Sequence, residues 1–228
     1  MEGSVPLPTD VDLTIIAIDG PAGSGKSTVA RLLADALDLD YLDTGAMYRS
    51  VTWAALERNV DPAAIEPVAA VAREISIDLG ADGTVVVDGH DVTDAIRTPR
   101  VSQSVSAVAA NAEVRTELVT RQREWARKRG GGVLEGRDIG TVVFPSAMLK
   151  IYLTASTEAR AARRARDEHT TDTSAVAADL DRRDKLDSER TADPLRQAEG
   201  AFVLDTSDLS IDQVVDALVE EFNERSTG

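Results

Sequence analysis

Residues 14–28 read TIIAIDGPAGSGKST, and this stretch decides how the chain folds. A run of apolar, mostly β-branched residues ends just before a glycine-rich segment, and a helical pattern begins near Lys26. The spacing of Gly20, Gly25, Lys26 and Ser27 matches the pattern G-x-x-x-x-G-K-[ST] of a phosphate-binding loop. The stretch therefore predicts a buried strand, a loop that holds phosphate, and a helix that starts beside it.

The parts of this loop have distinct physical roles. Glycines let the backbone curl until successive N–H groups point at phosphate oxygens, and the positive end of the helix adds to the same anion site. The Lys26 ammonium can reach the β- and γ-phosphates, while the Ser27 hydroxyl can bind Mg²⁺. We therefore expect the chain to bind a nucleoside triphosphate, although a glycine turn that merely joins strand to helix is the alternative. The residues expected to hold ATP are Gly20, Pro21, Ala22, Gly23, Ser24, Gly25, Lys26, Ser27 and Thr28.

The composition restricts what the protein can be. A chain of 228 residues fits a single α/β domain with small insertions. It contains no cysteine, which rules out disulfides and cysteine–metal sites and suits a reducing cytoplasm. Its formal net charge of −15 repels DNA and RNA, so anionic ligands need a local cluster of cations. No apolar run approaches the ~20 residues that span a bilayer, and we expect a cytoplasmic monomer whose residues 1–12 form a disordered leader.

Strand and helix patterns alternate along the chain, which predicts an α/β fold with a mostly parallel sheet and helices on both faces. The expected strands are residues 13–19, 41–42, 133–134, 149–153 and 201–204. The expected helices are residues 27–37, 46–58, 156–167, 173–190 and 211–224, and Ser156 caps the third of them. A helix at 62–73 and a hairpin with strands 75–79 and 84–88 interrupt the alternation and predict a small satellite unit ending near residue 100.

A phosphate-binding loop alone does not identify the reaction. The chain lacks the Asn-Lys-x-Asp motif with which GTPases read guanine, and it is too short for the large motor and transporter ATPases. A small kinase remains, and such an enzyme must also hold an acceptor. The sequence should therefore contain a second site for an anion, and four segments could supply it.

Two of these segments follow predicted strands at their carboxyl ends, where α/β sheets place their ligands. In the first, a helix starts at Thr44 and Gly45 and carries Arg49 one turn further on; the alternative is a capped helix with a solvated arginine. In the second, Arg137 places a bidentate donor beside Asp138, and the alternative is an ordinary Arg–Asp surface pair.

The other two segments lie on predicted helices. Arg183, Asp187 and Arg190 share one helical face because they are spaced i, i+4 and i+7. An arginine-rich helix followed by the polar stretch 167–172 is typical of a hinged lid, whose cations bridge donor and acceptor phosphates. In both cases the alternative is a solvated, salt-bridged face. The arginines of the last segment are Arg160, Arg163, Arg164 and Arg166.

Together these motifs resemble the bacterial cytidylate kinases among the P-loop nucleoside monophosphate kinases. The similarity runs from Thr14 to Phe222, and its most specific marks are residues 18–26, 42–49, 136–143 and 183–190. The resemblance implies a three-layer P-loop nucleoside kinase fold with a central parallel sheet. Its implied parts are a core at 13–61, 101–155 and 191–225, a small α+β monophosphate-binding insert at about 62–100, and a helical lid at about 156–190.

The resemblance also implies roles for individual residues. The acceptor phosphate would be held by Arg49 and Arg137, with Arg183 and Arg190 nearby when the lid closes. The sugar would meet Asp187 with Arg183. The monophosphate would be read by Thr44, Ser106, Arg115 and Asp138, the last three at the cytosine edge. The catalytic cations would be Lys26, Arg137, Arg160 and Arg164.

Some of these assignments rest on the resemblance alone. Ser106 lies in an alanine- and valine-rich stretch and Arg115 in a helix, and neither is singled out by its own pattern. Two departures from the family are mild: Thr44 stands where serine is common, and Glu135 where aspartate is also seen. Both substitutions keep a hydrogen-bonding group of the required kind.

The expected reaction is transfer of the γ-phosphoryl group of ATP to CMP, and to dCMP, with Mg²⁺ bound at Ser27. The acceptor phosphate is already ionised, so positioning and charge stabilisation suffice without a strong general base. Two alternatives stay open: another small P-loop kinase, for shikimate, gluconate or a different monophosphate, and a regulatory module that binds ATP without transferring phosphate. A pure sensor has no need for a second anion site, which argues against the latter.

Overall fold

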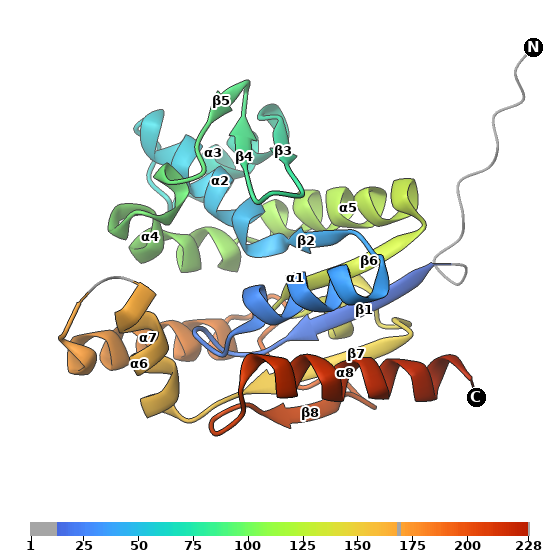
Figure 1. Ribbon diagram of the computed structural model, residues 1–228. Helices are drawn as coiled ribbons and strands as arrows, with labels where there is room; N and C mark the ends of the chain where they lie inside the picture. The colour runs from blue at the N-terminus through green and yellow to red at the C-terminus, as the bar shows by residue number, and fades with distance from the viewer. Residues whose placement is uncertain (1–12, 168–169, 228) are drawn as a thin grey trace, which may run out of the picture.

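The computed structural model describes residues 13–167 and 170–227, so the expected leader at 1–12 lies outside the described residues. Five strands, all parallel, form a sheet in the order β2-β6-β1-β7-β8 (Figure 1). This sheet confirms the expected α/β architecture. Its strands are β1 (Thr14–Asp19), β2 (Tyr41–Asp43), β6 (Gly131–Gly136), β7 (Leu149–Thr154) and β8 (Phe202–Asp205).

The central strand β1 builds a hydrophobic core on each face of the sheet. Successive side chains of a strand point to opposite faces, so a strand buried on both sides must be apolar throughout. Ile16 and Ile18 pack into one core, and Ile15 and Ala17 into the other. Two helices lie side by side over the first core in Figure 1, namely α1 (Lys26–Leu37) and α8 (Ile211–Ser226).

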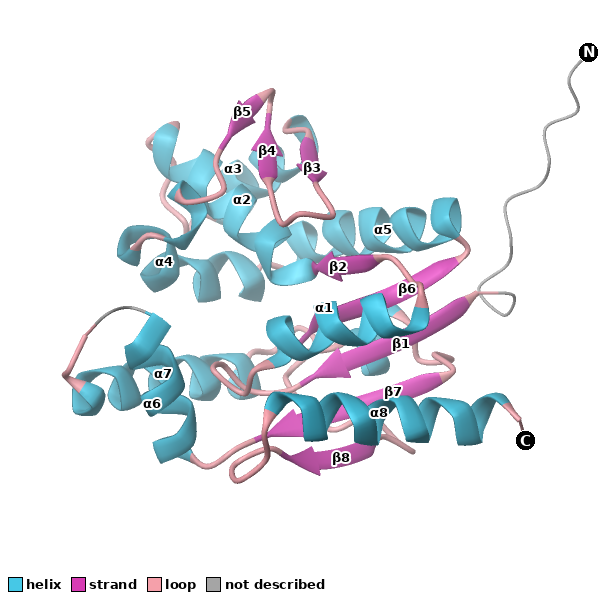
Figure 2. Ribbon diagram, in the orientation of Figure 1, coloured by secondary structure: helices cyan, strands magenta, loops and turns pink. Residues whose placement is uncertain are grey.

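The second face carries the larger core and most of the remaining helices, which makes three layers in all (Figure 2). No helix within residues 13–167 and 170–227 is long and apolar enough to cross a membrane. The helices of this face are α2 (Thr44–Glu57), α3 (Ile65–Glu74), α4 (Pro99–Ala110) and α5 (Ala112–Arg129).

The segment that interrupts the alternation folds as a small antiparallel sheet above α2 and α3. The expected hairpin is present, because β3 pairs antiparallel with β4, and the buried Val85 and Val87 join the larger core. A third strand, β5, was not expected, since its two residues are exposed and show no alternation. The strands are β3 (Ile77–Leu79), β4 (Val85–Val87) and β5 (His90–Asp91), and a 3-10 turn at Ala95–Arg97 leads back to α4.

Two helices form a separate pair at the carboxyl ends of the sheet strands, α6 (Thr157–Asp167) and α7 (Thr173–Glu189) (Figure 1). The expected cap of α6 is confirmed, because the Ser156 hydroxyl accepts the Ala159 N–H at 3.1 Å. The pair has a core of its own, which includes one residue of the phosphate-binding loop. Its members are Ala22, Ala161, Ala165, Val176 and Leu180.

The expected elements are otherwise present with small shifts at their ends. Helix α2 begins at Thr44, two residues before the expected start, because the Asp43 carboxylate accepts the Ala46 N–H at 2.8 Å and caps the helix. Helix α8 continues two residues beyond Glu224, to Ser226.

The order of the strands brings the predicted binding segments to one edge of the sheet. Asp19 at the end of β1 lies opposite Gly136 at the end of β6, and Asp43 of β2 lies opposite Glu135. The phosphate-binding loop, the start of α2 and the residues after β6 therefore leave the sheet next to one another. Segments more than 100 residues apart in sequence share one site.

The close approach of β1 and β6 can be tested at Gly131. Its φ is +135°, and a Cβ there would lie 2.2 Å from the carbonyl oxygen of Thr14. Since that atom belongs to the central strand, we expect Gly131→Ala to lower the free energy of unfolding by more than about 3 kcal/mol, measured by urea denaturation. The neighbouring Gly130→Ala is the control: its φ is +75° with nothing within 4 Å, and it should cost only about 1 kcal/mol. Equal losses would contradict the argument.

Candidate active site

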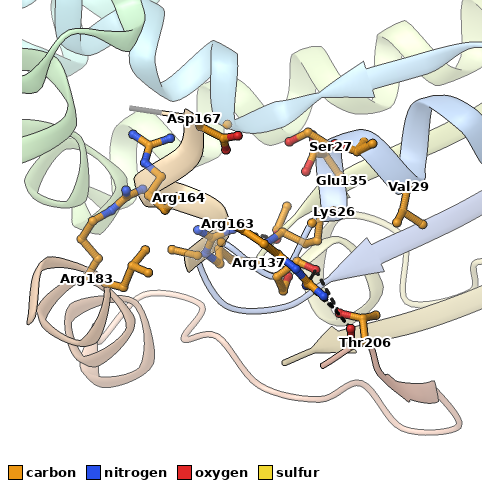
Figure 3. A pocket seen from close by; sticks show the side chains of 18 of the residues that line it. Lys26, Ser27, Val29, Glu135, Arg137, Arg163, Arg164, Asp167, Arg183 and Thr206 are labelled. Carbon is orange, nitrogen blue, oxygen red and sulfur yellow. Dashed lines mark hydrogen bonds between the residues drawn. The ribbon is translucent and has the colours of Figure 1, made fainter. Parts of the chain in front are cut away.

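A cavity of about 910 Å³ lies at the carboxyl ends of the strands. Its walls come from the phosphate-binding loop, the starts of α1 and α2, the residues after β6, the helical pair α6–α7 and the turn after β8. Figure 3 shows arginine side chains from several of these elements around the space next to Lys26. The cavity thus brings together the segments that carry the predicted motifs, and it adds residues from α4 and from the turn after β8.

The phosphate-binding loop has the backbone that its glycines predict. At Gly20 the φ is +151° and a Cβ would lie 2.0 Å from the carbonyl oxygen of Leu153, so only glycine fits beneath the loop. Gly25, with φ +89°, is the N-cap of α1, and no side chain caps this helix or places an acid in its first turn. The first N–H groups of α1 therefore remain available to an anion at the wall of the cavity.

Lys26 is buried and folded back onto its own loop. Its ammonium donates to the Pro21 carbonyl at 2.7 Å and to the Ser24 hydroxyl at 3.4 Å. Burial, followed by the positive charge of Arg137, lowers the pKa of Lys26 below its usual range. A phosphate bound beside Lys26 would stabilise the charged form of its ammonium group.

Asp19, the last residue of β1, connects the donor loop with the residues that follow β6. Its carboxylate accepts the N–H groups of Ile139 and Gly140, each at 2.8 Å. These residues begin a π-helical turn, Ile139–Val143, which Arg123 holds at its other end by donating to the carbonyls of Val142 and Val143. The π-helical turn is therefore held at both ends. It thereby also fixes the two residues that precede it and line the cavity, Arg137 and Asp138.

Three further arginines line the cavity and lie close enough to affect one another's charge. Arg49 donates to the Ile96 carbonyl and the Ser102 hydroxyl, and burial with the nearby Arg183 lowers its pKa to about 9. Arg137 donates through Nε to Asp187 at 2.9 Å. The Nε of Arg183 is buried without a hydrogen-bond partner among the described residues. This second concentration of cations, distinct from Lys26, is what an acceptor phosphate requires.

A deeper group of charges lies behind these arginines. Asp138 lines the cavity and contacts the buried Arg115 from behind, while Arg190 lies 3.4 Å from its other oxygen. Burial raises the pKa of Asp138 above its usual range, against the two arginines. Ser106 also lines this end of the cavity. Arg115 is not among the residues that line the cavity, and it reaches this end of it through Asp138. Its direct contact with the cytosine edge stays a prediction.

Arg160 contacts the phosphate-binding loop. Its Nη1 donates to the Ala22 carbonyl at 3.1 Å and pairs with Asp184, whose other oxygen accepts the Ala22 N–H at 2.9 Å. The ion pair between α6 and α7 therefore hydrogen-bonds both the N–H and the carbonyl of Ala22 in the phosphate-binding loop. With its guanidinium committed there, Arg160 is not among the residues that line the cavity. In this structure its contacts support the loop, and the catalytic role expected for Arg160 stays a prediction.

Arg163 belongs to the arginine run of the predicted lid, although only Arg160 and Arg164 of this run were expected to be catalytic. It lines the cavity and donates to the hydroxyl and the carbonyl of Thr206, at 2.9 and 2.5 Å (Figure 3). Thr206 begins the turn between β8 and α8, which forms the far wall of the cavity beside the phosphate-binding loop and was not predicted to take part. The arginine run was a signal for Arg163, but nothing in the sequence singled out the turn.

The same end of the cavity offers oxygen atoms that suit Mg²⁺. The Ser27 hydroxyl lies near the buried Glu135 carboxylate, which accepts a hydrogen bond from the Tyr41 hydroxyl. Hard cations prefer such oxygen donors, and Mg²⁺ keeps waters and substrate phosphates as its remaining ligands. A cluster of three or more His, Cys, Asp or Glu residues does not occur in the described part of the chain. The donor set therefore fits an ion delivered together with a nucleotide.

Most predicted residues line this cavity. Gly20 and Pro21 form the base of the loop, and Thr44 donates its hydroxyl to the Glu135 carbonyl at 2.6 Å while it faces the cavity. The predicted residues among the lining are Ala22, Gly23, Ser24, Gly25, Lys26, Ser27, Thr28, Thr44, Arg49, Ser106, Arg137, Asp138, Arg164, Arg183, Asp187 and Arg190.

Comparison with known proteins places the chain in one family, with a match over most of its length. The family model described as cytidylate kinase matches residues 16–224. The cytidylate kinase of Exiguobacterium sibiricum is 51% identical over 212 residues, which cover 90% of this chain and 95% of that protein. The cytidylate kinase of Bacillus subtilis is 47% identical over 218 residues, covering 92% of this chain and 97% of that protein.

Other relatives are longer or more distant. A bifunctional pantoate ligase/cytidylate kinase of Synechococcus sp. is 50% identical over 220 residues, which are 92% of this chain but only 44% of that protein. The chain thus spans less than half the length of such bifunctional relatives. A solved gluconokinase from Sinorhizobium meliloti has a TM-score of 0.50 at 13% identity, with 93% of both chains covered, and shares the fold.

The charge on Asp19 gives the site a measurable pH dependence. Burial raises the pKa of Asp19 to about 6, despite two backbone hydrogen bonds that lower it. A raised pKa in the folded state means that stability is lost as pH rises from the unfolded value near 3.8 through about 6. Asp19→Asn removes this titration, although it leaves one N–H poorly paired at every pH.

We therefore expect the unfolding free energy of Asp19→Asn to increase relative to that of wild type as pH rises from about 5 to 7.5. The expected gain is about 1.4 kcal/mol, the value of one pKa unit. Urea denaturation of both proteins across this range measures it. A difference that changes in the opposite direction would show that the backbone hydrogen bonds outweigh the burial of the carboxylate.

Proposed function

The chain belongs to the cytidylate kinase family, and from that premise we propose that it transfers the γ-phosphoryl group of ATP to CMP and to dCMP. The observation that carries the proposal is the joint cavity. Its lining combines the phosphate-binding loop and Lys26 with a second set of cations, Arg49, Arg137 and Arg183. Two phosphorylated molecules can meet there end to end.

The donor side holds the triphosphate of ATP. The N–H groups at the start of α1 and the Lys26 ammonium bind its phosphates, with the positive end of the helix behind them. Ser27 and Glu135 are the residues that would hold Mg²⁺, which neutralises charge on the phosphate oxygens. Arg163 and Arg164 extend this positive wall from α6.

The acceptor side positions an oxygen of the CMP phosphate for attack on the γ-phosphorus. As that bond forms, the bond from the γ-phosphorus to the bridging oxygen breaks, and ADP leaves with the electron pair. The CMP phosphate is already an anion, so the enzyme needs no strong base. Arg49, Arg137 and Arg183 bind this phosphate and stabilise the charge that spreads over the transferred group.

Cytosine recognition falls to the group of charges beyond these arginines. The 4-amino group of cytosine is a hydrogen-bond donor, and the Asp138 carboxylate and Ser106 hydroxyl, which line this end of the cavity, are acceptors. Uracil presents an oxygen at the same position and leaves the carboxylate without a donor. A site built on hydrogen bonds rejects an analogue that leaves them unmade. Asp187, with Arg183, is placed to meet the sugar.

Two parts of the fold would move or adapt during this reaction. We assign the segment at about 62–100 as the monophosphate-binding insert, because its end supplies Arg97 to the cavity wall and its Ile96 carbonyl orients Arg49. We assign the pair α6–α7 as the lid, because its arginines face both the donor and the acceptor sides.

The role of Lys26 is tested by Lys26→Ala. Loss of one preorganised donor of this kind lowers turnover by about 10²–10³, and we expect that loss in kcat measured by ADP release, with an unchanged circular dichroism spectrum. Retention of more than about a tenth of the wild-type rate would show that Lys26 does not stabilise the transferred phosphoryl group.

The choice of acceptor is tested by measuring ADP release with CMP, dCMP, UMP, AMP and GMP in turn. We expect CMP and dCMP to react well ahead of AMP and GMP, with UMP weaker than CMP, because of the hydrogen-bonding pattern that Asp138 requires. Equal rates for AMP and CMP would contradict the specificity for cytosine, although the protein would still be a kinase. If no monophosphate stimulates ADP release, the protein binds ATP without transferring phosphate.

A further inference from the structure

We propose that Asp193, which follows the lid helix α7, is a positioning residue for base selection: it orients the two arginines that flank Asp138. The proposal rests on the proposed function, because it concerns how the same site distinguishes cytosine from uracil. Asp193 was not singled out by any sequence motif, and it is not among the residues that line the cavity.

Asp193 uses two different groups to hold two different arginines. Its carboxylate accepts from Arg115 Nε at 2.7 Å, and its backbone carbonyl accepts from Arg190 Nε at 2.7 Å. Both arginines then turn their outer nitrogens toward Asp138. Arg115 Nη2 donates to one oxygen of Asp138, and Arg190 Nη2 lies 3.4 Å from the other. The four residues form a closed ring in which positive and negative groups alternate.

The ring leaves two buried nitrogens without a hydrogen bond. Within the described residues neither Arg115 Nη1 nor Arg190 Nη2 has a hydrogen-bond partner, although Arg115 is almost fully buried. Buried donors are nearly always satisfied, so each exception calls for an explanation. We take these two as signs that the arginines are held for their effect on Asp138 and on a ligand beside it. An arginine that was free to rotate would pair these groups elsewhere.

The backbone shows why this position is set so firmly. Asp193 has φ +50°, a left-handed conformation that aspartate, asparagine and glycine tolerate better than other residues. Leu195, two residues on, is buried and donates its N–H to the Asp187 carbonyl at 2.8 Å. The short link from α7 back to the core is thus anchored on both sides of Asp193.

The chemical consequence concerns the Asp138 carboxylate. Held between two oriented arginines, it keeps a fixed direction, and it accepts a hydrogen bond from the 4-amino group of cytosine. If Arg115 loses Asp193, its guanidinium is tied to Asp138 alone and can swing with it. The Asp138 carboxylate then forms a weaker hydrogen bond with the 4-amino group of cytosine. It also repels the 4-oxygen of uracil less strongly.

The test uses two variants that separate the carboxylate from the backbone. Asp193→Gly keeps the left-handed conformation without strain and removes the carboxylate, whereas Asp193→Asn keeps an oxygen acceptor without the charge. The matched control is Asp38→Gly, since Asp38 is exposed, has φ +53° at the end of α1 and lies outside the site. For each protein, kcat and KM are measured for CMP, UMP and ATP, together with the melting temperature.

For Asp193→Gly we expect the KM for CMP to rise about tenfold and the ratio of kcat/KM for CMP over UMP to fall about tenfold, as lost charge-assisted hydrogen bonds cause. The KM for ATP should stay within about twofold. Asp193→Asn should fall between this variant and wild type, and Asp38→Gly should change neither the KM for CMP nor the base ratio.

Two results would overturn the proposal. An unchanged base ratio in Asp193→Gly would mean that Asp193 does not act on selection. Equal increases of the KM values for CMP and ATP with a lower melting temperature would mean that it only stabilises the fold. The wild-type rate with CMP distinguishes failure of this proposal from failure of the proposed kinase activity. If the wild-type protein does not phosphorylate CMP, both proposals are wrong. If it does, the kinase activity stands, and the Asp193 variants test the role of Asp193 alone.

Discussion

Burying arginine charge is the physical problem that organises the phosphate end of this molecule. Removing a guanidinium from water is unfavourable unless a carboxylate or an anion compensates for it. Some arginines carry a built-in partner: Arg160 has Asp184, and Arg115 has two carboxylates. Arg49, by contrast, donates its hydrogen bonds to neutral groups, and the charge of Asp43 only partly offsets its burial. The first kind supports the walls, and in the proposed function the second kind binds the phosphates of a nucleotide.

This division explains how an acidic protein can bind anions. The net charge of −15 is spread over the surface, whereas the cations gather in one cavity with low-dielectric walls. Coulombic attraction is stronger in such a place than at an exposed surface, so a few arginines outweigh many distant carboxylates. Burial, followed by the charge of a neighbouring arginine, lowers the pKa values of two of these arginines, Arg49 and Arg183.

The sequence predicted the sheet, the hairpin and the cavity from features that act locally. The glycine pattern at 20–25 follows from steric contacts beneath the loop, and Asp43 and Ser156 cap the helices that follow them. Faces of the lid helix could not be predicted in this way. Alanines occur on both sides of α6: Ala161 and Ala165 are buried beside the loop, whereas Ala159 and Ala162 line the cavity. Apolar spacing therefore could not tell which arginines of the run point at the loop.

Long-range contacts account for the other residues that were missed or misplaced. Arg115 is buried because Asp138, from another part of the chain, and Asp193, further still, meet it inside the fold. Nothing near Arg115 in sequence distinguishes it from the surface arginines of α5. The resemblance to a family supplied Arg115 and Ser106, but not Asp193, whose importance depends on a left-handed link between α7 and the core.

The parallel pairing of β1 with β6 joins residues 14–19 to residues 131–136. During synthesis the donor loop leaves the ribosome long before the strand that must lie beside it, and the loop closed by that contact is among the longest in the fold. Such distant contacts form slowly, because the chain loses entropy when the long loop closes, before the hydrogen bonds and packing of the sheet compensate for that loss. A nascent chain that ends before β6 holds the glycine-rich segment without its binding site, so nucleotide can stabilise this protein only late in its folding.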